Sequence, residues 1–266
     1  MKQRMKKSAG LVLAFLMLFS MFVLPVSAEE TKSEPVSVTV RIEGLDKTLV
    51  EETKLEVENF DLTPFGATKE KEAATALHAL INALGLKEKD DSFDVNADEG
   101  WINSILGYKT EGDFSWMFTV NDEMANVGCA QYALKDGDSL VFYYSDWTVG
   151  SYSYFTEKNL TVKAGEPFTV TLNGLGFDAD FNPAIAPVAG ATLLVSQNGT
   201  EEKTESITKE DGTASLSIAN PGTYLISAVR NSADNAEKID ISRPYCIVTV
   251  KAVFPDICLL YTSRCV

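Results

Sequence analysis

Residues 112–121, GDFSWMFTVN, decide the fold of the first part of the chain. The bulky apolar side chains occupy every second position: Phe114, Trp116, Phe118 and Val120. This alternation is typical of a strand with one buried face. Residues 132–140, YALKDGDSL, then place a tight turn that needs Gly137 before an aromatic strand ending at Trp147. The two segments predict a β-meander.

Upstream of this meander, the sequence predicts two strands and a helix. Residues 36–42 alternate apolar and polar side chains, and a second such stretch lies around residues 48–57. Residues 69–84 carry apolar side chains at spacings of three and four, and Gly85 follows at the C-cap position. His78 is expected on the surface of this helix. The segment 37–148 is therefore predicted to be an α+β domain.

Downstream, the pattern changes to strands alone. A Tyr, Ser and Gly-rich joint covers residues 148–155, and no helical period follows. Short alternating runs are separated by turn clusters such as Asn220-Pro221-Gly222, which is typical of a β-sandwich over residues 156–253. The predicted fold class is α+β, a small β-grasp-like sheet with one helix, followed by an all-β immunoglobulin-like sandwich.

The N-terminus has the pattern of a bacterial signal peptide over residues 1–28. Four basic residues precede an apolar run from Ala9 to Leu24, which ends in the small-residue pattern Val26-Ser27-Ala28. An uncleaved anchor helix is the alternative, but the run is short for a membrane span. With a polar linker at 29–36, this predicts a protein that works outside the cell or on its surface.

The charge of the mature chain excludes some partners. Removing residues 1–28 deletes four positive charges and no acidic ones, so the formal net charge moves from −15 to about −19. Such a surface repels phosphate backbones and anionic lipid, so no nucleic-acid partner is expected. Membrane contact is expected only through the signal peptide, or through a C-terminal anchor if the true protein is longer than this sequence.

The cysteines and acidic loops predict no metal site. The chain has four cysteines and one histidine, with no CxxC spacing, so structural zinc is not expected. A Cys129–Cys246 disulfide is permitted outside the cell but would link the two predicted domains; free thiols are the alternative. Asp178, Asp180 and Asn182 begin like a calcium loop, yet the required Gly and Glu are missing, which favours an ordinary acidic loop.

The C-terminal segment, residues 254–266, differs from the rest of the chain. It has no acidic residue after Asp256, and Cys258 and Cys265 lie close together in it. We expect that this tail is not native sequence and assign it no function.

The ordered motifs at 112–121 and 132–140, with the aromatic strand ending in Asp146-Trp147, resemble the DUF4430 family. This small domain also occurs at the C-terminus of transcobalamin and intrinsic factor, where it closes over cobalamin together with a large helical barrel. That barrel is absent here. The resemblance, over residues 37–148, implies a ligand-binding ancestry. Segments 187–193 and 208–214 are similar to bacterial immunoglobulin-like and carboxypeptidase-regulatory-like repeats, which serve as spacers.

Aromatic side chains of the first domain are the candidate ligand contacts. Aromatic rings offer flat apolar area with a polar edge, which suits a corrin ring, a glycan or a peptide. The candidates are the aromatic residues Trp101, Trp116, Tyr132, Tyr144 and Trp147, together with Asn121. The alternative is that Trp116 and others belong to the core. Because Tyr143 and Tyr144 are adjacent, one of them must face away from that core.

No catalytic motif is present, so neither an enzyme nor a bound cofactor is expected. The sequence therefore predicts an exported binding protein that captures a small extracellular ligand, with cobalamin as the leading candidate. The alternative is a structural or adhesive surface protein that binds a glycan or a protein, with the β-sandwich as spacer.

Overall fold

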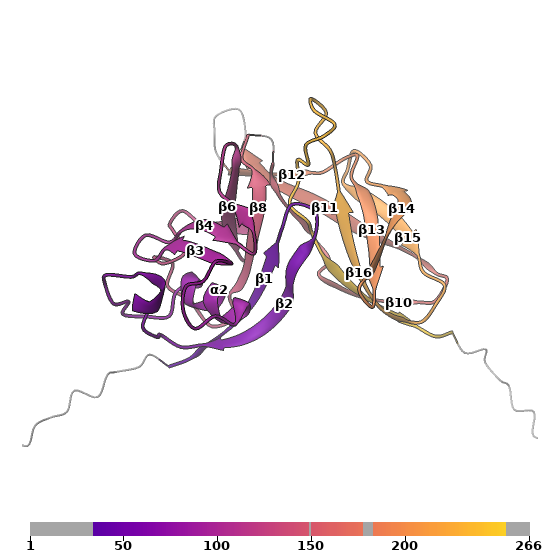
Figure 1. The fold of residues 1–266 in the computed structure, drawn as a ribbon. Helices are drawn as coiled ribbons and strands as arrows, with labels where there is room; N and C mark the ends of the chain where they lie inside the picture. The colour runs from indigo at the N-terminus through magenta and orange to yellow at the C-terminus, as the bar shows by residue number, and fades with distance from the viewer. Residues whose placement is uncertain (1–33, 149, 178–182, 254–266) are drawn as a thin grey trace, which may run out of the picture. The chain divides into compact units, whose positions relative to one another are not determined.

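A computed structural model describes residues 34–148, 150–177 and 183–253 (Figure 1). We call residues 34–148 the first module and the described residues from 150 to 253 the second module. The predicted signal peptide, the tail 254–266 and the segment with Asp178, Asp180 and Asn182 lie outside the described residues.

The first module is built on a five-stranded sheet in the order β2-β1-β8-β6-β7. Its strands are β1 (Val36–Glu43), β2 (Thr48–Val57), β6 (Phe114–Val120), β7 (Glu123–Met124) and β8 (Ser139–Asp146). The hairpin β1–β2 is antiparallel, whereas β1 and β8 run parallel, with Val40 opposite Leu140. Helix α2 (Ala76–Leu84) packs against β1 and β2. The helix and the aromatic face of β6 therefore share one core.

A smaller sheet closes the other side of this core. It contains β3 (Phe93–Asn96), β4 (Trp101–Ile105) and β5 (Tyr108–Lys109), and a 3-10 turn, η2 (Thr63–Phe65), packs nearby. Phe65 and Phe93 meet edge to face with ring centroids 6.2 Å apart. Helix α2 ends as predicted, with Gly85 in the left-handed region at φ 67°.

The second module consists of two sheets around a separate core. One sheet has the order β10-β17-β16-β13-β14, and the other has the order β12-β11-β15 with β9 also paired to β11. Its strands are β9 (Tyr152–Phe155), β10 (Asn159–Lys163), β11 (Pro167–Phe177), β12 (Pro183–Pro187), β13 (Thr192–Gln197), β14 (Thr200–Ile207), β15 (Thr213–Ser217), β16 (Gly222–Val229) and β17 (Cys246–Lys251). Phe155, Leu172, Leu193, Ile226 and Val248 are fully buried in this core, an arrangement consistent with a β-sandwich.

The predicted α+β class, with a β-grasp-like first domain, is wrong for this chain, which is largely β. Among the described residues, α2 is the one α-helix, and it spans nine residues. The helix predicted over 69–84 begins late because Thr75 has extended geometry, with φ −119° and ψ 168°, and acts as its N-cap. In addition, β9 occupies part of the segment 148–155 that was expected to be a joint.

Candidate ligand-binding site

Two of the predicted contact residues, Trp116 and Tyr144, are core side chains. Trp116 is 8% exposed, and its Nε1–H donates to the carbonyl oxygen of Tyr108 at 2.8 Å. The Tyr144 hydroxyl donates to the carbonyl oxygen of Lys109 at 2.5 Å, and its ring stacks on Phe114 at 5.6 Å between centroids. These contacts hold β6 and β8 against β5. The prediction that Trp116 and Tyr144 contact a ligand is therefore wrong, because their rings fill the core.

The other four predicted residues do not form one site. Asn121 has φ 55° at the β6–β7 turn, and its side-chain oxygen accepts the backbone N–H of Ser139 at 2.9 Å, which is a structural role. Tyr132 is half-buried with its edge against Phe118. Trp101 and Trp147 are 66% and 61% exposed. Of the six, only these two tryptophans keep a large accessible ring.

Tyr143 faces away from the first core, as the adjacency of the two tyrosines predicts. It is nevertheless only 1% exposed, because Tyr152 of the second module covers it at 5.4 Å between ring centroids. Val141 and Tyr143 from β8 form a small apolar cluster with Tyr152, and Leu175 of β11 packs against it. The sheet face opposite the helix is thus buried by the second module, and all described residues belong to one compact unit.

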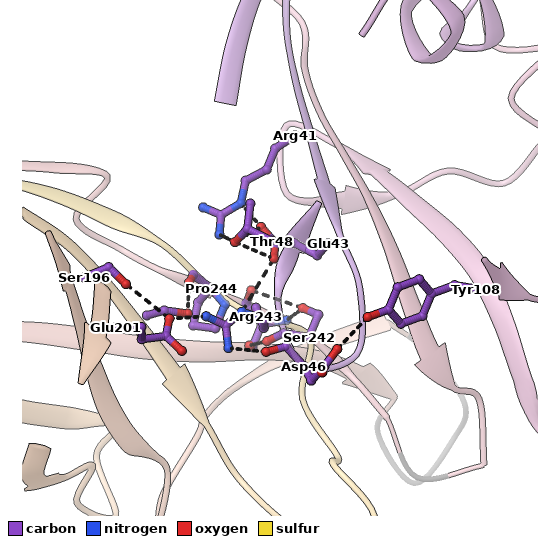
Figure 2. Close-up of polar contacts among 12 residues, drawn as sticks. Arg41, Glu43, Asp46, Thr48, Tyr108, Ser196, Glu201, Ser242, Arg243 and Pro244 are labelled. Atoms are coloured by element: carbon purple, nitrogen blue, oxygen red, sulfur yellow. Dashed lines mark hydrogen bonds and ion pairs between the residues drawn. The ribbon is translucent and has the colours of Figure 1, made fainter. Parts of the chain in front are cut away.

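A buried charge network (Figure 2) lies beside this apolar cluster, because Arg41 and Glu43 are opposite Val141 and Tyr143 in the β1–β8 pairing. Arg41 and Glu43 are on the same face of β1 and form an ion pair with side chains 3% and 0% exposed. The Thr48 hydroxyl donates to Glu43 Oε2 at 3.0 Å, and Arg243 Nε lies 3.7 Å from the same oxygen. Burial raises the pKa of the Glu43 carboxyl, and the charges of Arg41 and Arg243 oppose that shift.

Arg243, a residue of the second module, links the network to one hairpin in each module. Its Nη1 donates to the carbonyl oxygen of Asp46 in the β1–β2 turn at 3.3 Å, and its Nη2 donates to Glu201 Oε2 at 2.5 Å (Figure 2). Ser196 donates to the same Glu201 oxygen at 3.3 Å. One guanidinium therefore fixes the β1–β2 hairpin relative to the β13–β14 hairpin.

A groove of 490 Å³ opens between these two hairpins, next to the network. Its lining comes from both modules: Arg41, Lys47, Thr48, Glu51, Glu52, Ser196, Gln197, Asn198, Gly199, Glu201, Thr223, Tyr224, Leu225, Arg243 and Ile247. None of the six residues predicted as ligand contacts is among them. The sequence analysis missed this site completely.

The groove lining combines a larger apolar surface with groups that form hydrogen bonds. Carboxylates, amides, hydroxyls and one lysine face it, whereas its aromatic residue, Tyr224, is 7% exposed with its hydroxyl donating to the carbonyl oxygen of Asn220. In the described part of the chain, no group of three His, Cys, Asp or Glu side chains is arranged to hold a metal ion. Such a lining offers hydrogen-bonding groups within an open groove.

The comparison with known families supports the resemblance to DUF4430. Residues 73–146 match DUF4430, a domain of unknown function. The DUF4430 match runs from just before α2 to the end of β8. It is shorter than the expected 37–148 and leaves out the hairpin β1–β2.

Other comparisons add little to the DUF4430 match. A crystal structure of the N-terminal four Ig domains of Dscam1 isoform 4.4 is similar at 9% identity, with a TM-score of 0.21, over 84% of this chain and 47% of that chain. The chain thus spans about half the length of that structure. No curated protein matches the sequence. A search of the described residues finds no helix with both the length and the apolar character needed to cross a membrane.

The two cysteines of the described modules are free thiols. Cys129 lies in the first core with its Sγ 3.2 Å from the carbonyl oxygen of Gly100, and Cys246 lies in the second core. A bridge between them is absent. Burial raises the pKa of the Cys129 thiol to about 12, so the group stays protonated and inert at neutral pH.

His78 is buried within the fold, so its expected position on the helix surface is wrong. Its Nδ1 accepts the backbone N–H of Thr75 at 3.0 Å, as the third helical residue of a capping box does. Its Nε2 therefore carries the proton and donates to the carbonyl oxygen of Phe60 at 3.0 Å. The neutral ring thus forms hydrogen bonds with two backbone groups, the N–H of Thr75 and the carbonyl oxygen of Phe60.

Replacement of His78 should alter how stability depends on pH. Burial lowers the pKa of His78 below its ordinary value of 6.5, so the unfolded chain takes up this proton first as the pH falls. The stabilising contribution of the neutral ring is present above about pH 6.5 and is lost on acidification. His78→Gln keeps the capping hydrogen bond but loses the hydrogen bond to Phe60, so its free energy of unfolding at pH 7.5 should be about 1 kcal/mol below that of the wild type. The glutamine side chain does not titrate.

Thermal unfolding of both proteins between pH 7.5 and 5 checks this expectation. The melting temperature of the wild type should fall more steeply than that of His78→Gln, so the two values converge. Parallel curves would show that His78 titrates alike in the folded and unfolded chains.

Proposed function

We propose that the protein is exported and captures a small ligand in the groove between the β1–β2 and β13–β14 hairpins, without chemical conversion. The observation that carries this proposal is the groove itself, because its 490 Å³ volume falls within the range of about 300–1,000 Å³ typical of small-molecule sites. The buried contacts of Arg243 hold both walls in place before a ligand arrives. Such preorganisation reduces the entropy lost on binding.

The extracellular location rests on the signal-peptide pattern of residues 1–28. The strongly acidic surface fits a protein that stays in solution or on a cell surface without binding nucleic acid.

Cobalamin stays a proposed ligand, but the support for it comes from the groove and no longer from the aromatic residues. Trp116 and Tyr144 fill the core, and the groove offers carboxylates and amides in place of a stacking platform. The amide side chains at the periphery of a corrin ring can hydrogen-bond to such a lining. The groove is too small to enclose cyanocobalamin, so only an edge of the corrin ring would enter it; cyanocobalamin is tested beside oligosaccharides of similar polarity.

A bulky residue in the groove should abolish binding. Thr223 is an exposed lining residue on β16, so Thr223→Trp fills the groove. Thr161→Trp is the matched control, because Thr161 lies on β10 of the same sheet, is also exposed and is not part of the lining. We expect at least a tenfold loss of affinity in Thr223→Trp alone, measured by isothermal titration with cyanocobalamin and with a tetramer of N-acetylglucosamine. Equal affinity in both variants would place binding elsewhere.

A second candidate function is adhesion to a surface glycan or protein through the first module. It is favoured by Trp101 and Trp147, whose large rings are 66% and 61% exposed and lie outside the groove lining. Exposed tryptophans are enriched in interaction sites. In this case the second module acts as a spacer.

A further inference from the structure

The sequence contains the dipeptide Asn-Gly twice, and the fold places the two copies in different surroundings. Asn173-Gly174 lies in strand β11, whereas Asn198-Gly199 forms the turn between β13 and β14. Asparagine is a chemically labile residue. Its side-chain amide carbon can be attacked by the backbone nitrogen of the next residue, and a glycine there hinders the attack least because it has no side chain.

The fold leaves the Asn198-Gly199 copy free to react. Both residues are exposed, and they make up the whole two-residue loop, since Gln197 is paired with Thr200. Their φ angles of 52° and 78° are both positive, as in the type I′ turns that Asn-Gly favours. Within the described ranges, neither the Asn198 amide group nor the Gly199 N–H has a hydrogen-bond partner. The attack requires rotation of the Asn198 backbone, and opening of such a loop tip costs little free energy.

The Asn173-Gly174 copy is held in place from both sides. Asn173 is paired with Tyr154 of β9 and with Pro187 of β12, and Gly174 lies between the same two strands. The Asn173 Nδ2 group donates to Thr156 Oγ1 at 2.8 Å. Attack by the Gly174 nitrogen would require β11 to separate from its neighbours, which costs far more than opening a loop tip. This copy is therefore an internal control with identical chemistry.

We propose that Asn198, and not Asn173, is a modification site at which the folded protein converts asparagine to aspartate and isoaspartate without an enzyme. Hydroxide removes the proton of the Gly199 N–H, and the nitrogen attacks Cγ of Asn198. The bond between Cγ and Nδ2 then breaks, and Nδ2 takes a proton from water and leaves as ammonia. A five-membered succinimide ring remains, and no oxidant or reductant takes part.

One water molecule then opens the ring at either of its two carbonyl carbons. Cleavage between Cγ and the Gly199 nitrogen gives aspartate with the original backbone. Cleavage between the main-chain carbonyl carbon of residue 198 and that nitrogen gives isoaspartate, whose side chain becomes part of the backbone and lengthens the turn. Because Asn198 lines the groove, both products replace an amide of its wall with a carboxylate. The conversion needs no bound ligand, so it is independent of the proposed function.

Peptide mass spectrometry after incubation in ¹⁸O-labelled water tests this proposal. The chain from Glu29 onward is kept at pH 7.5 and at pH 8.5 and is then cleaved before aspartate, which recovers the two asparagines in separate peptides because Asp178 and Asp180 lie between them. We expect Asn198 of the folded protein to take up one ¹⁸O atom at least tenfold faster than Asn173. The rate should be higher at pH 8.5, because hydroxide takes part. The protease cleaves before the new aspartate but not before isoaspartate, which distinguishes the two products.

Two controls separate the effect of the fold from that of the sequence. In guanidinium chloride, which unfolds the chain, Asn198 and Asn173 should react at similar rates. Asn198→Gln should remove the reaction at residue 198, because glutamine would have to close a six-membered ring, and should leave Asn173 unchanged. Similar rates at Asn198 and Asn173 in the folded protein would overturn the proposal, since the turn and the strand would then affect the reaction alike.

Discussion

Trp116→Ala should lower the free energy of unfolding by about 3–5 kcal/mol. The side chain is buried against Tyr108 and Tyr144, and its Nε1–H has an acceptor within the fold. Truncation therefore leaves a cavity and an unpaired carbonyl group. Urea denaturation followed by far-ultraviolet circular dichroism gives this value without relying on tryptophan fluorescence.

Trp101→Ala is the control for Trp116, because its ring is 66% exposed. A surface substitution of this kind changes stability by less than about 0.5 kcal/mol. Similar stability of the two variants, with binding lost in Trp116→Ala alone, would restore Trp116 as a ligand contact.

Glu43→Leu should have a comparably large effect, about 3–5 kcal/mol. Its carboxylate is the common partner of Arg41 and Arg243, and all three side chains are at most 6% exposed. Without Glu43, the buried Arg41 guanidinium loses its ion-pair partner, and Arg243 keeps only Glu201. The change is measured as a shift of the urea midpoint at constant slope.

Two further variants decide whether burial of the charges causes the large effect of Glu43→Leu. Asp94→Asn breaks the Lys89–Asp94 pair, whose side chains are 48% and 40% exposed, and should cost less than about 1 kcal/mol. Combining Glu43→Leu with Arg41→Met and Arg243→Met removes the three most buried charges and leaves only Glu201, whose side chain is 36% exposed, so it should recover most of the lost stability. A Glu43→Leu effect no larger than that of Asp94→Asn would show that the network contributes little.

Local patterns in the sequence predicted much of the first module. Alternation along residues 112–121 correctly places Trp116 and Phe118 on one face of β6, and Gly85 correctly ends the helix. Periodicity assigns side chains to faces, but it does not say what covers each face. The same alternation that placed Trp116 among Phe118 and Val120 was therefore compatible with an open aromatic surface and with a core.

The groove was missed for the same physical reason. Arg41 and Glu43 alternate with Val40 and Ile42, a pattern typical of a strand with one solvated face. In the structure that polar face is buried, because the second module packs on it through Tyr152 and Arg243. Contacts between segments about 200 residues apart, such as Arg243 with Asp46, leave no local signal in a single sequence.

Backbone amide chemical shifts, recorded while the ligand is titrated, test the central claim most directly. Cyanocobalamin and the N-acetylglucosamine tetramer are added in turn to the ¹⁵N-labelled chain from Glu29 onward. The groove account predicts that the largest shift changes fall in residues 47–52, 196–201 and 223–225. Changes confined to the surroundings of Trp101 and Trp147 would contradict it and favour adhesion through the first module.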